Sequence, residues 1–576
     1  MHSHPYDMKK ILLSLSVLTL SACAQSGTPS DAGTGEIRMA EMMGISVEEL
    51  RSQTPEEHMQ MMLKKNGTMN QEHGMMMDEE DGMMMGGDES GFLPGEQVRL
   101  ESLPKRKTTE HITMSDGDTM ELNPTLIRST VNGREVAMYG YNGQIPGPTI
   151  KVPQGATITL ITTNKIDMNT TVHSHGIRLE NANDGVPGVT QETILPNGTF
   201  RYEIRFPDEG VYWYHPHVRE DIQQDMGLYG NYIVTPANED AYAPVNKEEV
   251  LVLDDILLNS EGAPVAYGKE NANFPLMGRF GNFMLINGQS AKNYSLQVQQ
   301  GSVVRFYITN VASTRTFRMN FGGAQMKLVG SDVGRYEKEQ WVKDITIAPS
   351  ERYIVDVLFD NPGTYSLSHI SPLATYNLGT VSVDETPAAF MYMEEFGVLR
   401  SHSDVIADMD EYRPFFDKAV DKTLRLDIEM GGMNHSMMME HTNDGIEWED
   451  SMPQMNAMMT GDQVKWKLVD EQSGKENMDF LWKFKTGDIA KVRIINDKNS
   501  PHPMQHPIHF HGQRFLVLSM DGVPNNNLVW KDTVLVPTGS TADLLFDMSN
   551  PGNWMFHCHI AEHLTNGMMG MFQVSD

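Results

Sequence analysis

The stretch from residue 557 to 568 combines the soft donor groups that copper prefers. It reads His-Cys-His and continues to His563 and Met568. A cysteine thiolate, an imidazole and a weak axial thioether are ligands of a blue-copper electron-transfer centre, which needs a second imidazole as well. Cys558, His563 and Met568 therefore predict part of a copper site.

His557 and His559 flank this cysteine. Successive side chains of an extended strand point to opposite faces, so both histidines should face away from Cys558. One peptide segment would then contact two metal sites. Because a lone buried cysteine is more often a core residue, this interpretation requires further ligands at matching spacings elsewhere.

Three further histidine motifs supply such ligands. The segment from His506 to Gly512 contains three histidines, enough for the missing imidazole and two more. In each His-x-His pair both imidazoles lie on one face of a strand, which suits two metals held close together. Ten of the twenty histidines fall in the four motifs. The histidines of these three motifs are His173, His175, His215, His217, His506, His509 and His511.

In type, spacing and order, the four motifs resemble those of the bacterial multicopper oxidases, the family of laccases, copper-efflux oxidases and copper-resistance oxidases. The resemblance covers about residue 120 to the C-terminus and implies four copper ions per chain. The type 1 (blue) ligands would be His506, Cys558, His563 and Met568. The type 2 ligands would be His173 and His509, and the type 3 ligands His175, His215, His217, His511, His557 and His559.

The same resemblance implies a reaction. Substrate would reduce the type 1 copper, and electrons would pass through Cys558 to the other three coppers, where dioxygen is reduced to water. Asp184 matches the family's carboxylate beside this cluster and would deliver protons and orient bound water; the alternative is an ordinary turn aspartate. Many bacterial relatives carry a glutamate where this chain has Leu564. Either Glu562 or another acid takes that role, or proton delivery differs.

The elements that must position these ligands are strands. Three segments share one pattern: a strand, a turn glycine, and an alternating strand that ends at an asparagine nine residues after the glycine. The asparagines are Asn164, Asn310 and Asn496. Such a repeat predicts three similar β units, which we interpret as cupredoxin-like Greek-key barrels. The expected chain is all-β, with domain 1 at 101–240, domain 2 at 241–400 and domain 3 at 401–576.

The repeat also predicts where copper is absent. At the positions that correspond to His173 and His175, the second copy has Met319 and Phe321. His369 lies one position away from a ligand position and is expected to be structural. Domain 2 should therefore lack copper, and the three-copper cluster should lie between domains 1 and 3.

The N-terminus predicts export. Two lysines precede an apolar run at 11–20 that is too short to span a bilayer and is typical of a signal peptide. The following Leu-Ser-Ala-Cys23 resembles a bacterial lipobox, so residues 1–23 would be a lipoprotein signal peptide; an ordinary signal peptide is the alternative. For a Gram-negative source, Ala24 after the cysteine favours the outer membrane. We expect a protein of the periplasm or outer cell surface, held at the membrane by a lipid on Cys23.

Methionine is concentrated in two polar stretches. Half of the forty-four methionines lie within 24–95 and 430–459. We predict an acidic, methionine-rich tether over 24–100 and a methionine-rich insert at 430–459 in domain 3. Thioethers are soft donors that prefer Cu(I). The candidate Cu(I) ligands are Met433, Met437, Met438, Met439 and Met504.

Met504 stands where Cu(I)-oxidising relatives place a substrate methionine, although their aspartate two residues earlier is His502 here. A flexible core methionine explains Met504 alone, but not the insert. The expected reactants are dioxygen and a small reductant or metal ion, and the expected function is oxidation of Cu(I) in copper tolerance.

Several other functions are weighed against this one. A net charge of −32 argues against nucleic-acid binding, and two cysteines give no disulfide framework. A laccase-type phenol oxidase and a Mn(II) oxidase use the same copper core and stay open. A copper nitrite reductase lacks the type 3 pair, and a nonenzymatic copper carrier needs no cluster built across two domains.

Overall fold

The computed structural model describes residues 91–431 and 444–576. The predicted signal peptide, Cys23, almost all of the tether, and Met433, Met437, Met438 and Met439 lie outside the described residues. Within them, no helix is long and apolar enough to cross a membrane.

Domain 1 is built from strands and short helical turns. A five-stranded sheet has the order β1-β5-β10-β9-β7, a three-stranded sheet the order β2-β6-β8, and β3 pairs with β4. The elements are η1 (Leu100–Ser102), β1 (His111–Thr113), β2 (Thr119–Glu121), β3 (Pro124–Val131), β4 (Arg134–Tyr141), β5 (Thr149–Pro153), β6 (Thr157–Thr163), β7 (His173–His175), η2 (Asn181–Asn183), β8 (Thr199–Arg205), β9 (Gly210–His215), α4 (Glu220–Gln223) and β10 (Gly230–Thr235).

Domain 2 packs a seven-stranded sheet, β13-β12-β11-β15-β20-β17-β18, against a five-stranded one, β14-β22-β21-β16-β19. Its elements are β11 (Lys247–Ile256), β12 (Phe283–Ile286), β13 (Gln289–Ser290), η3 (Ala291–Asn293), β14 (Ser295–Gln300), β15 (Ser302–Asn310), β16 (Phe317–Phe321), β17 (Gln325–Ser331), β18 (Gly334–Val342), β19 (Ile345–Ile347), β20 (Arg352–Phe359), β21 (Gly363–Ile370) and β22 (Thr375–Pro387).

Domain 3 has a six-stranded sheet, β24-β23-β26-β31-β28-β29, and a five-stranded sheet, β25-β33-β32-β27-β30. Its elements are β23 (Lys422–Met430), α7 (Pro453–Met458), β24 (Val464–Asp470), η5 (Asn477–Asp479), β25 (Leu481–Lys485), β26 (Asp488–Asn496), β27 (His506–Phe510), β28 (Arg514–Met520), β29 (Val523–Pro524), β30 (Thr533–Val536), β31 (Thr541–Met548), β32 (Gly552–Cys558), α8 (Ala561–Thr565) and β33 (Met569–Ser575).

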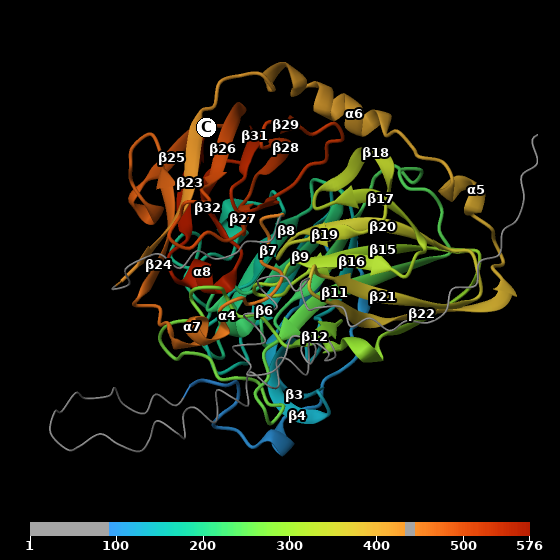
Figure 1. The fold of residues 1–576 in the computed structure, drawn as a ribbon, viewed down its shortest axis with the longest axis horizontal. Helices are drawn as coiled ribbons and strands as arrows, with labels where there is room; N and C mark the ends of the chain where they lie inside the picture. The colour runs from blue at the N-terminus through green and yellow to red at the C-terminus, as the bar shows by residue number, and fades with distance from the viewer. Residues whose placement is uncertain (1–90, 432–443) are drawn as a thin grey trace, which may run out of the picture. The chain divides into compact units, whose positions relative to one another are not determined.

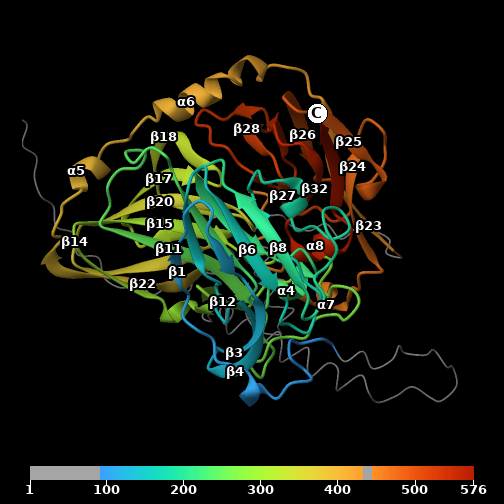
Figure 2. The same cartoon turned by 180° about the vertical axis from the view of Figure 1, so that it is seen from behind.

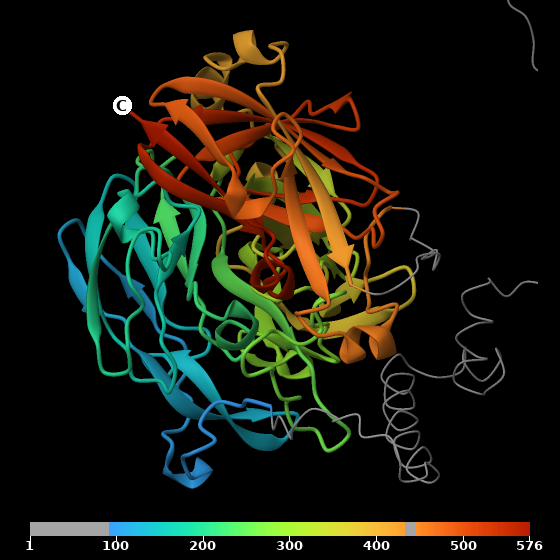
Figure 3. The same cartoon turned by 90° about the vertical axis from the view of Figure 1, so that its left-hand side faces the viewer.

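A helical linker joins domains 2 and 3. It contains α5 (Met393–Phe396), α6 (Ser403–Asp410) and the turn η4 (Arg413–Phe415), which follow one another along one edge of the two domains (Figures 1 and 2). Domain 3, coloured orange to red, lies against the other two domains in Figure 3. Hydrogen bonds from Arg178 to Ser549 and from Val333 to Trp530 mark its two interfaces.

The predicted all-β fold with three cupredoxin-like domains is confirmed, and the repeat has a structural reason. The turn glycines Gly155, Gly301 and Gly487 have φ of +88°, +78° and +89°, a conformation that only glycine adopts readily. The three closing asparagines are buried, and each side-chain amide donates two hydrogen bonds of 2.7 to 3.0 Å to carbonyls farther along the chain, in loops or at strand ends. One acceptor in domain 3 is Met504, two residues before His506. In domains 1 and 3 these bonds hold the loops that lead into the ligand-bearing strands β7 and β27.

Domain 2 fills the corresponding positions with core residues. Met319 and Phe321 are buried in its apolar core. His369 is also buried; its Nδ1 accepts a hydrogen bond from the Arg318 backbone at 2.9 Å, and its ring stacks on Tyr376. Burial lowers the pKa of His369 to about 3, so the ring is neutral and acts as a packing residue.

Candidate metal centre

The first candidate site gathers one cysteine and two histidines at the end of β32. Cys558 ends this strand, His563 lies on α8, and His506 begins the neighbouring strand β27. The Cys558 Sγ is 3.5 Å from the His506 Nδ1 and 3.7 Å from the His563 Nδ1, and the two nitrogens are 3.3 Å apart. All three side chains are buried. This triangle of one sulfur and two nitrogens is the equatorial set of a blue-copper site.

Met568 lies beside this triangle. It is fully buried, its backbone N–H donates to the His563 carbonyl at 3.0 Å, and its own carbonyl accepts from the Cys558 N–H at 3.1 Å. The predicted axial residue is therefore next to the cysteine. Burial raises the pKa of the Cys558 thiol, so a bound cation is needed to hold it as a thiolate.

The second candidate site gathers eight histidines that lie on, or directly after, two pairs of strands. In domain 1, β7 pairs with β9 and sets His173 opposite His215; in domain 3, β27 pairs with β32 and sets His509 opposite His557. Three groups of imidazoles have ligand atoms within 4.8 Å of one another. They are His175, His215 and His559; His217, His511 and His557; and His173, His509 and His511.

Hydrogen bonds orient several of these rings. The Nδ1 atoms of His173, His215, His509 and His557 lie 2.7 to 2.9 Å from backbone carbonyls, which fixes Nδ1 as the donor and leaves Nε2 with a lone pair. The Nε2 atoms then point at one another, as in the pair from His511 and His557 at 3.1 Å.

Unpartnered nitrogens show that this pocket suits metal ions. Buried polar atoms are almost always hydrogen-bonded. Here five buried Nε2 atoms have no hydrogen-bond partner among the described residues: those of His173, His175, His215, His509 and His559. Burial, together with the neighbouring imidazoles, lowers the pKa of His215, His557 and His559 well below the ordinary value. Neutral imidazoles with converging free lone pairs are the donors that copper binds.

Asp184 joins ligands of two domains. Its carboxylate accepts from the His511 Nδ1 at 2.9 Å and lies 3.3 Å from the His173 Nδ1, while its carbonyl accepts from His173 at 2.7 Å. Burial would raise the pKa of Asp184, but His511 and His173 outweigh burial and hold it well below its usual range. A side chain on Gly185 would meet the Val172 carbonyl at 2.1 Å, so this turn requires glycine. Asp184 is an ionised residue of the site and more than a turn aspartate.

Sequence reasoning missed three residues at these sites. Glu220 lies 2.9 Å from the His217 Nδ1. Asp532 lies 3.3 Å from the His175 Nδ1. Trp466 stacks on His563 with ring centroids 4.0 Å apart. Only for Glu220 was there a local signal, since it follows His217 by three residues.

Trp466 belongs to a cover over the first site. Its indole also contacts His506, and its Nε1 donates to the Pro275 carbonyl at 2.8 Å. Asn456 on α7 holds the residues that follow Pro275. Its side-chain amide donates to the Gly278 carbonyl at 2.8 Å, and its Oδ1 accepts from the N–H groups of 276 and 277. We call Trp466, residues 275–278 and α7 the entry cover. Met504 is fully buried.

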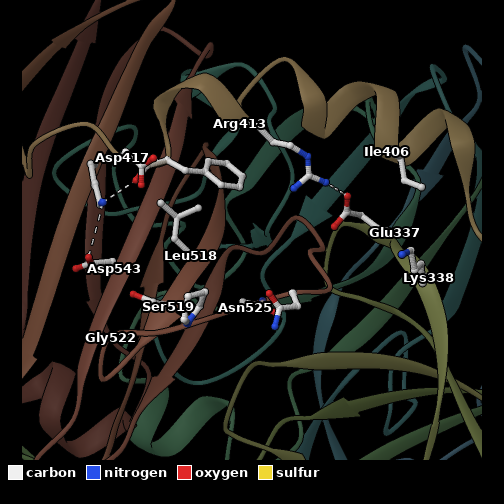
Figure 4. Close-up of a pocket in the computed structure, with 14 residues that line it drawn as sticks. Glu337, Lys338, Ile406, Arg413, Asp417, Leu518, Ser519, Gly522, Asn525 and Asp543 are labelled. Atoms are coloured by element: carbon white, nitrogen blue, oxygen red, sulfur yellow. Dashed lines mark hydrogen bonds and ion pairs between the residues drawn. The ribbon is translucent and has the colours of Figure 1, made fainter.

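A cavity of about 590 Å³ lies elsewhere, beneath the linker helix α6 (Figure 4). Residues of domains 2 and 3 and of the linker line it, including Glu337, Arg413, Leu518 and Asp543. None of the candidate metal ligands borders it, so it is not the site of the predicted chemistry.

Comparison with known proteins identifies the family. Family models described as multicopper oxidase match residues 125–239, 244–393 and 447–576. The chain belongs to the multicopper oxidase family. It is therefore an oxidoreductase that uses copper, and the two histidine-rich sites are where that copper fits.

Relatives of this oxidase carry several names. "Multicopper oxidase mco" of Staphylococcus haemolyticus is 25% identical over 447 residues, which cover 76% of this chain and 84% of the relative. "Copper resistance protein A" of Escherichia coli is 24% identical and covers 77% of this chain and 91% of the relative. The solved multicopper oxidase from Campylobacter jejuni, titled a metallo-oxidase, matches with a TM-score of 0.61 and 21% identity, over 84% of this chain and 99% of that one.

Proposed function

We propose that this multicopper oxidase oxidises Cu(I) to Cu(II), couples that oxidation to the reduction of dioxygen to water, and serves copper tolerance. The observation that carries the proposal is the burial of His506 and His563 beneath the entry cover. A planar phenol needs open access to the edge of a ligand imidazole, whereas a small ion carried by thioethers does not. The copper-resistance name of one relative supports the same choice.

The proposal assigns four coppers per chain. His506, Cys558, His563 and Met568 would hold type 1 copper; His173 and His509 type 2 copper; and the other six histidines the type 3 pair. When bound, copper supplies one-electron acceptance at the cysteine site and four-electron reduction of dioxygen at the three-copper site. The chain connects the two sites directly, because Cys558 is bonded through the backbone to His557 and His559, which face the second cluster.

Protons must reach the second cluster. Asp184 would hold the rings of His173 and His511 and orient a water between them, as its contacts support. Leu564 is a buried apolar residue and cannot carry a proton. Glu562 is buried, and burial and the charge of Asp221 raise its pKa to about 8. We therefore propose that Glu562 stores a proton at neutral pH on Oε1, which has no hydrogen-bond partner in the described part of the chain.

The methionine-rich insert would supply the substrate ion. Met433, Met437, Met438 and Met439 belong to the chain segment that leads toward α7 and the entry cover. Soft thioethers bind Cu(I) in preference to hard cations. Met504 is buried and lies two residues before His506 in sequence, so it would receive the ion after the methionines of the insert.

The decisive experiment replaces these four methionines with leucine. Leucine keeps size and hydrophobicity but removes the sulfur, so Cu(I) turnover should fall several-fold while phenol oxidation stays equal or rises. Oxygen consumption with Cu(I), Mn(II), Fe(II) and a phenol is the measurement. The matched control replaces Met391, which lies between β22 and α5, and Met393, the first residue of α5; both are exposed. Unchanged Cu(I) kinetics, with faster Mn(II) or phenol turnover throughout, would instead assign a manganese oxidase or a laccase.

We also propose export and attachment to the outer membrane through a lipid on Cys23. The proposal rests on the apolar run and lipobox-like motif of the sequence. An anchored enzyme of the cell envelope would meet copper before that metal enters the cytoplasm.

A further inference from the structure

Asp532 contacts two predicted copper ligands from different domains. It precedes β30 in domain 3 and is fully buried. Its carbonyl accepts from the His509 Nδ1 at 2.9 Å. Its Oδ1 lies 3.5 Å from the same nitrogen and 3.3 Å from the His175 Nδ1. The two rings stack with centroids 3.6 Å apart, so one carboxylate borders both rings of a stacked pair.

A residue of domain 2 holds this carboxylate. Arg352, at the start of β20, donates from Nη1 to the Asp532 Oδ1 at 2.8 Å and from Nη2 to Oδ2. Its Nε donates to the Val211 carbonyl on β9 of domain 1 at 2.8 Å. The guanidinium is fully buried, and its hydrogen bonds to Val211, Ser350 and Asp532 reach all three domains.

This pairing fixes the position of both carboxylate oxygens. A planar guanidinium presents its donors in a rigid fork, so a bidentate pair fixes orientation as well as distance. A buried carboxylate without such a partner would be costly. Because the fork occupies both oxygens, Asp532 can orient the imidazoles but is poorly placed to bind a metal itself.

The close approach also explains the glycine after His175. A Cβ on Gly176 would lie 2.2 Å from the Asp532 Oδ2 and 2.7 Å from the Arg352 Nη2, and its φ is +84°. Domain 1 therefore leaves room at this point for the ion pair formed by the other two domains.

We propose that Asp532 is a positioning residue for the type 2 copper and the adjoining type 3 copper, and that domain 2 acts on these coppers through Arg352. The proposal rests on the proposed copper assignment. Domain 2 contributes no residue to the metal-ligand groups found in the described residues, yet its arginine sets the orientation of His175 and His509. Outer-sphere partners of this kind tune metal affinity and geometry.

Two variants of the copper-loaded full chain test the positioning role of Asp532. Asp532→Asn removes the charge, and Arg352→Lys keeps a positive charge but loses the fork. Both should weaken retention of the type 2 copper against a chelator by about 10-fold to 100-fold. Both should also change the type 2 signal in electron paramagnetic resonance, while the visible absorption of the Cys558 site stays at its wild-type intensity.

The matched control is Arg305→Lys. Arg305 also makes a bidentate pair, through Nε and Nη2, with Asp356 between β15 and β20. Both contacts are 2.8 Å and both residues are buried, but Arg305 borders no candidate ligand. This variant should lose thermal stability without changing copper content or the type 2 signal.

Two results would overturn the proposal: wild-type type 2 affinity and spectrum in Arg352→Lys and Asp532→Asn, or an equal loss of type 2 copper in Arg305→Lys. If Asp532→Asn does not fold, Arg352→Lys decides alone. These readouts use no substrate, so a failure of Cu(I) oxidation would leave them unaffected. A wild-type chain without a type 2 signal would instead refute the copper assignment itself.

Discussion

At the scale of single residues, the two sites depend on the ionisation states that burial enforces. Histidines whose pKa values are lowered stay neutral and present lone pairs, whereas the buried thiol of Cys558 needs a cation to ionise. Copper binding should therefore release the thiol proton while leaving the histidines uncharged.

Replacing Cys558 with serine should abolish the blue absorption and nearly all turnover. The hydroxyl is a poor ligand for type 1 copper and a poor electron conduit, but it fits the space of the thiol. Cys558 forms no disulfide in the described structure, so the fold should survive. Visible absorption, copper content and circular dichroism are the measurements. A blue and active variant would refute the assignment.

The raised pKa of Glu562 predicts a pH-dependent cost to stability. A glutamate in the unfolded chain ionises near its ordinary pKa of 4.5, but Glu562 in the folded chain ionises only near pH 8. The folded state thus binds the extra proton, so its stability falls as the pH rises between these values. Glu562→Gln removes this cost.

The stability of the copper-free Glu562→Gln variant relative to wild type should increase from pH 5 to pH 8. The gain should be at most roughly 4 kcal/mol, since one pKa unit corresponds to about 1.4 kcal/mol. Thermal unfolding at the two pH values measures it. Glu261→Gln, at an exposed position, is the control. An equal difference at pH 5 and pH 8 would contradict the assigned pKa.

At the scale of elements, strands present the ligands and a helix screens them. The alternation along β32 separates Cys558 from its two neighbours, as expected for an extended strand, and sends them to different clusters. The helix α7 has six residues and relies on Asn456 to stay attached to the loop at 276–278.

Asn456→Ala should loosen the entry cover. The change leaves two buried N–H groups and one carbonyl without their partner, which costs about 1–3 kcal/mol for a buried group. Phenol oxidation should rise, because Trp466 would lose the support of residues 275–278, while the blue absorption stays unchanged. Steady-state oxygen consumption with a phenol measures this rise. Asn287→Ala, which removes similar bonds to Val250 and Val252 in domain 2, should not raise phenol turnover.

At the scale of the whole molecule, the second metal site exists only where domains 1 and 3 meet. Ligands from both domains converge there, and Arg352 of domain 2 contacts both domains. None of the three domains could build this site alone. The proposed export and lipid anchoring also concern the whole molecule.

Replacing Cys23 with serine should release the protein from membranes in soluble or unprocessed form. Lipid attachment requires the thiol, and Cys23 lies far in sequence from the copper ligands, so turnover per bound copper should not change. Fractionation of cells followed by mass analysis of the mature N-terminus is the measurement. A wild-type protein that is entirely soluble and cleaved at another residue would refute the lipid anchor.

The sequence by itself determined the fold class and supplied the candidate ligands. A ligand motif such as His-Cys-His is local, and strand alternation decides which side chains share a face, so the candidate ligands and the three repeats followed without coordinates. The assignment of Asp184 to the site followed from the resemblance of the motifs to those of the multicopper oxidases. The contacts of Asp184 with His173 and His511 agree with that assignment.

Only the tertiary structure decided which residues surround those ligands. Trp466, Asp532 and Arg352 lie on strands or turns that no local pattern distinguishes from ordinary core and ion-pair positions. Their roles come from packing between domains, where Arg352 and Asp532 are 180 residues apart in the chain. Tertiary packing also buries Met504 and forms the entry cover, because burial depends on which sheet edges and loops meet. Local chemistry selects the ligands, and long-range packing sets their orientation and access.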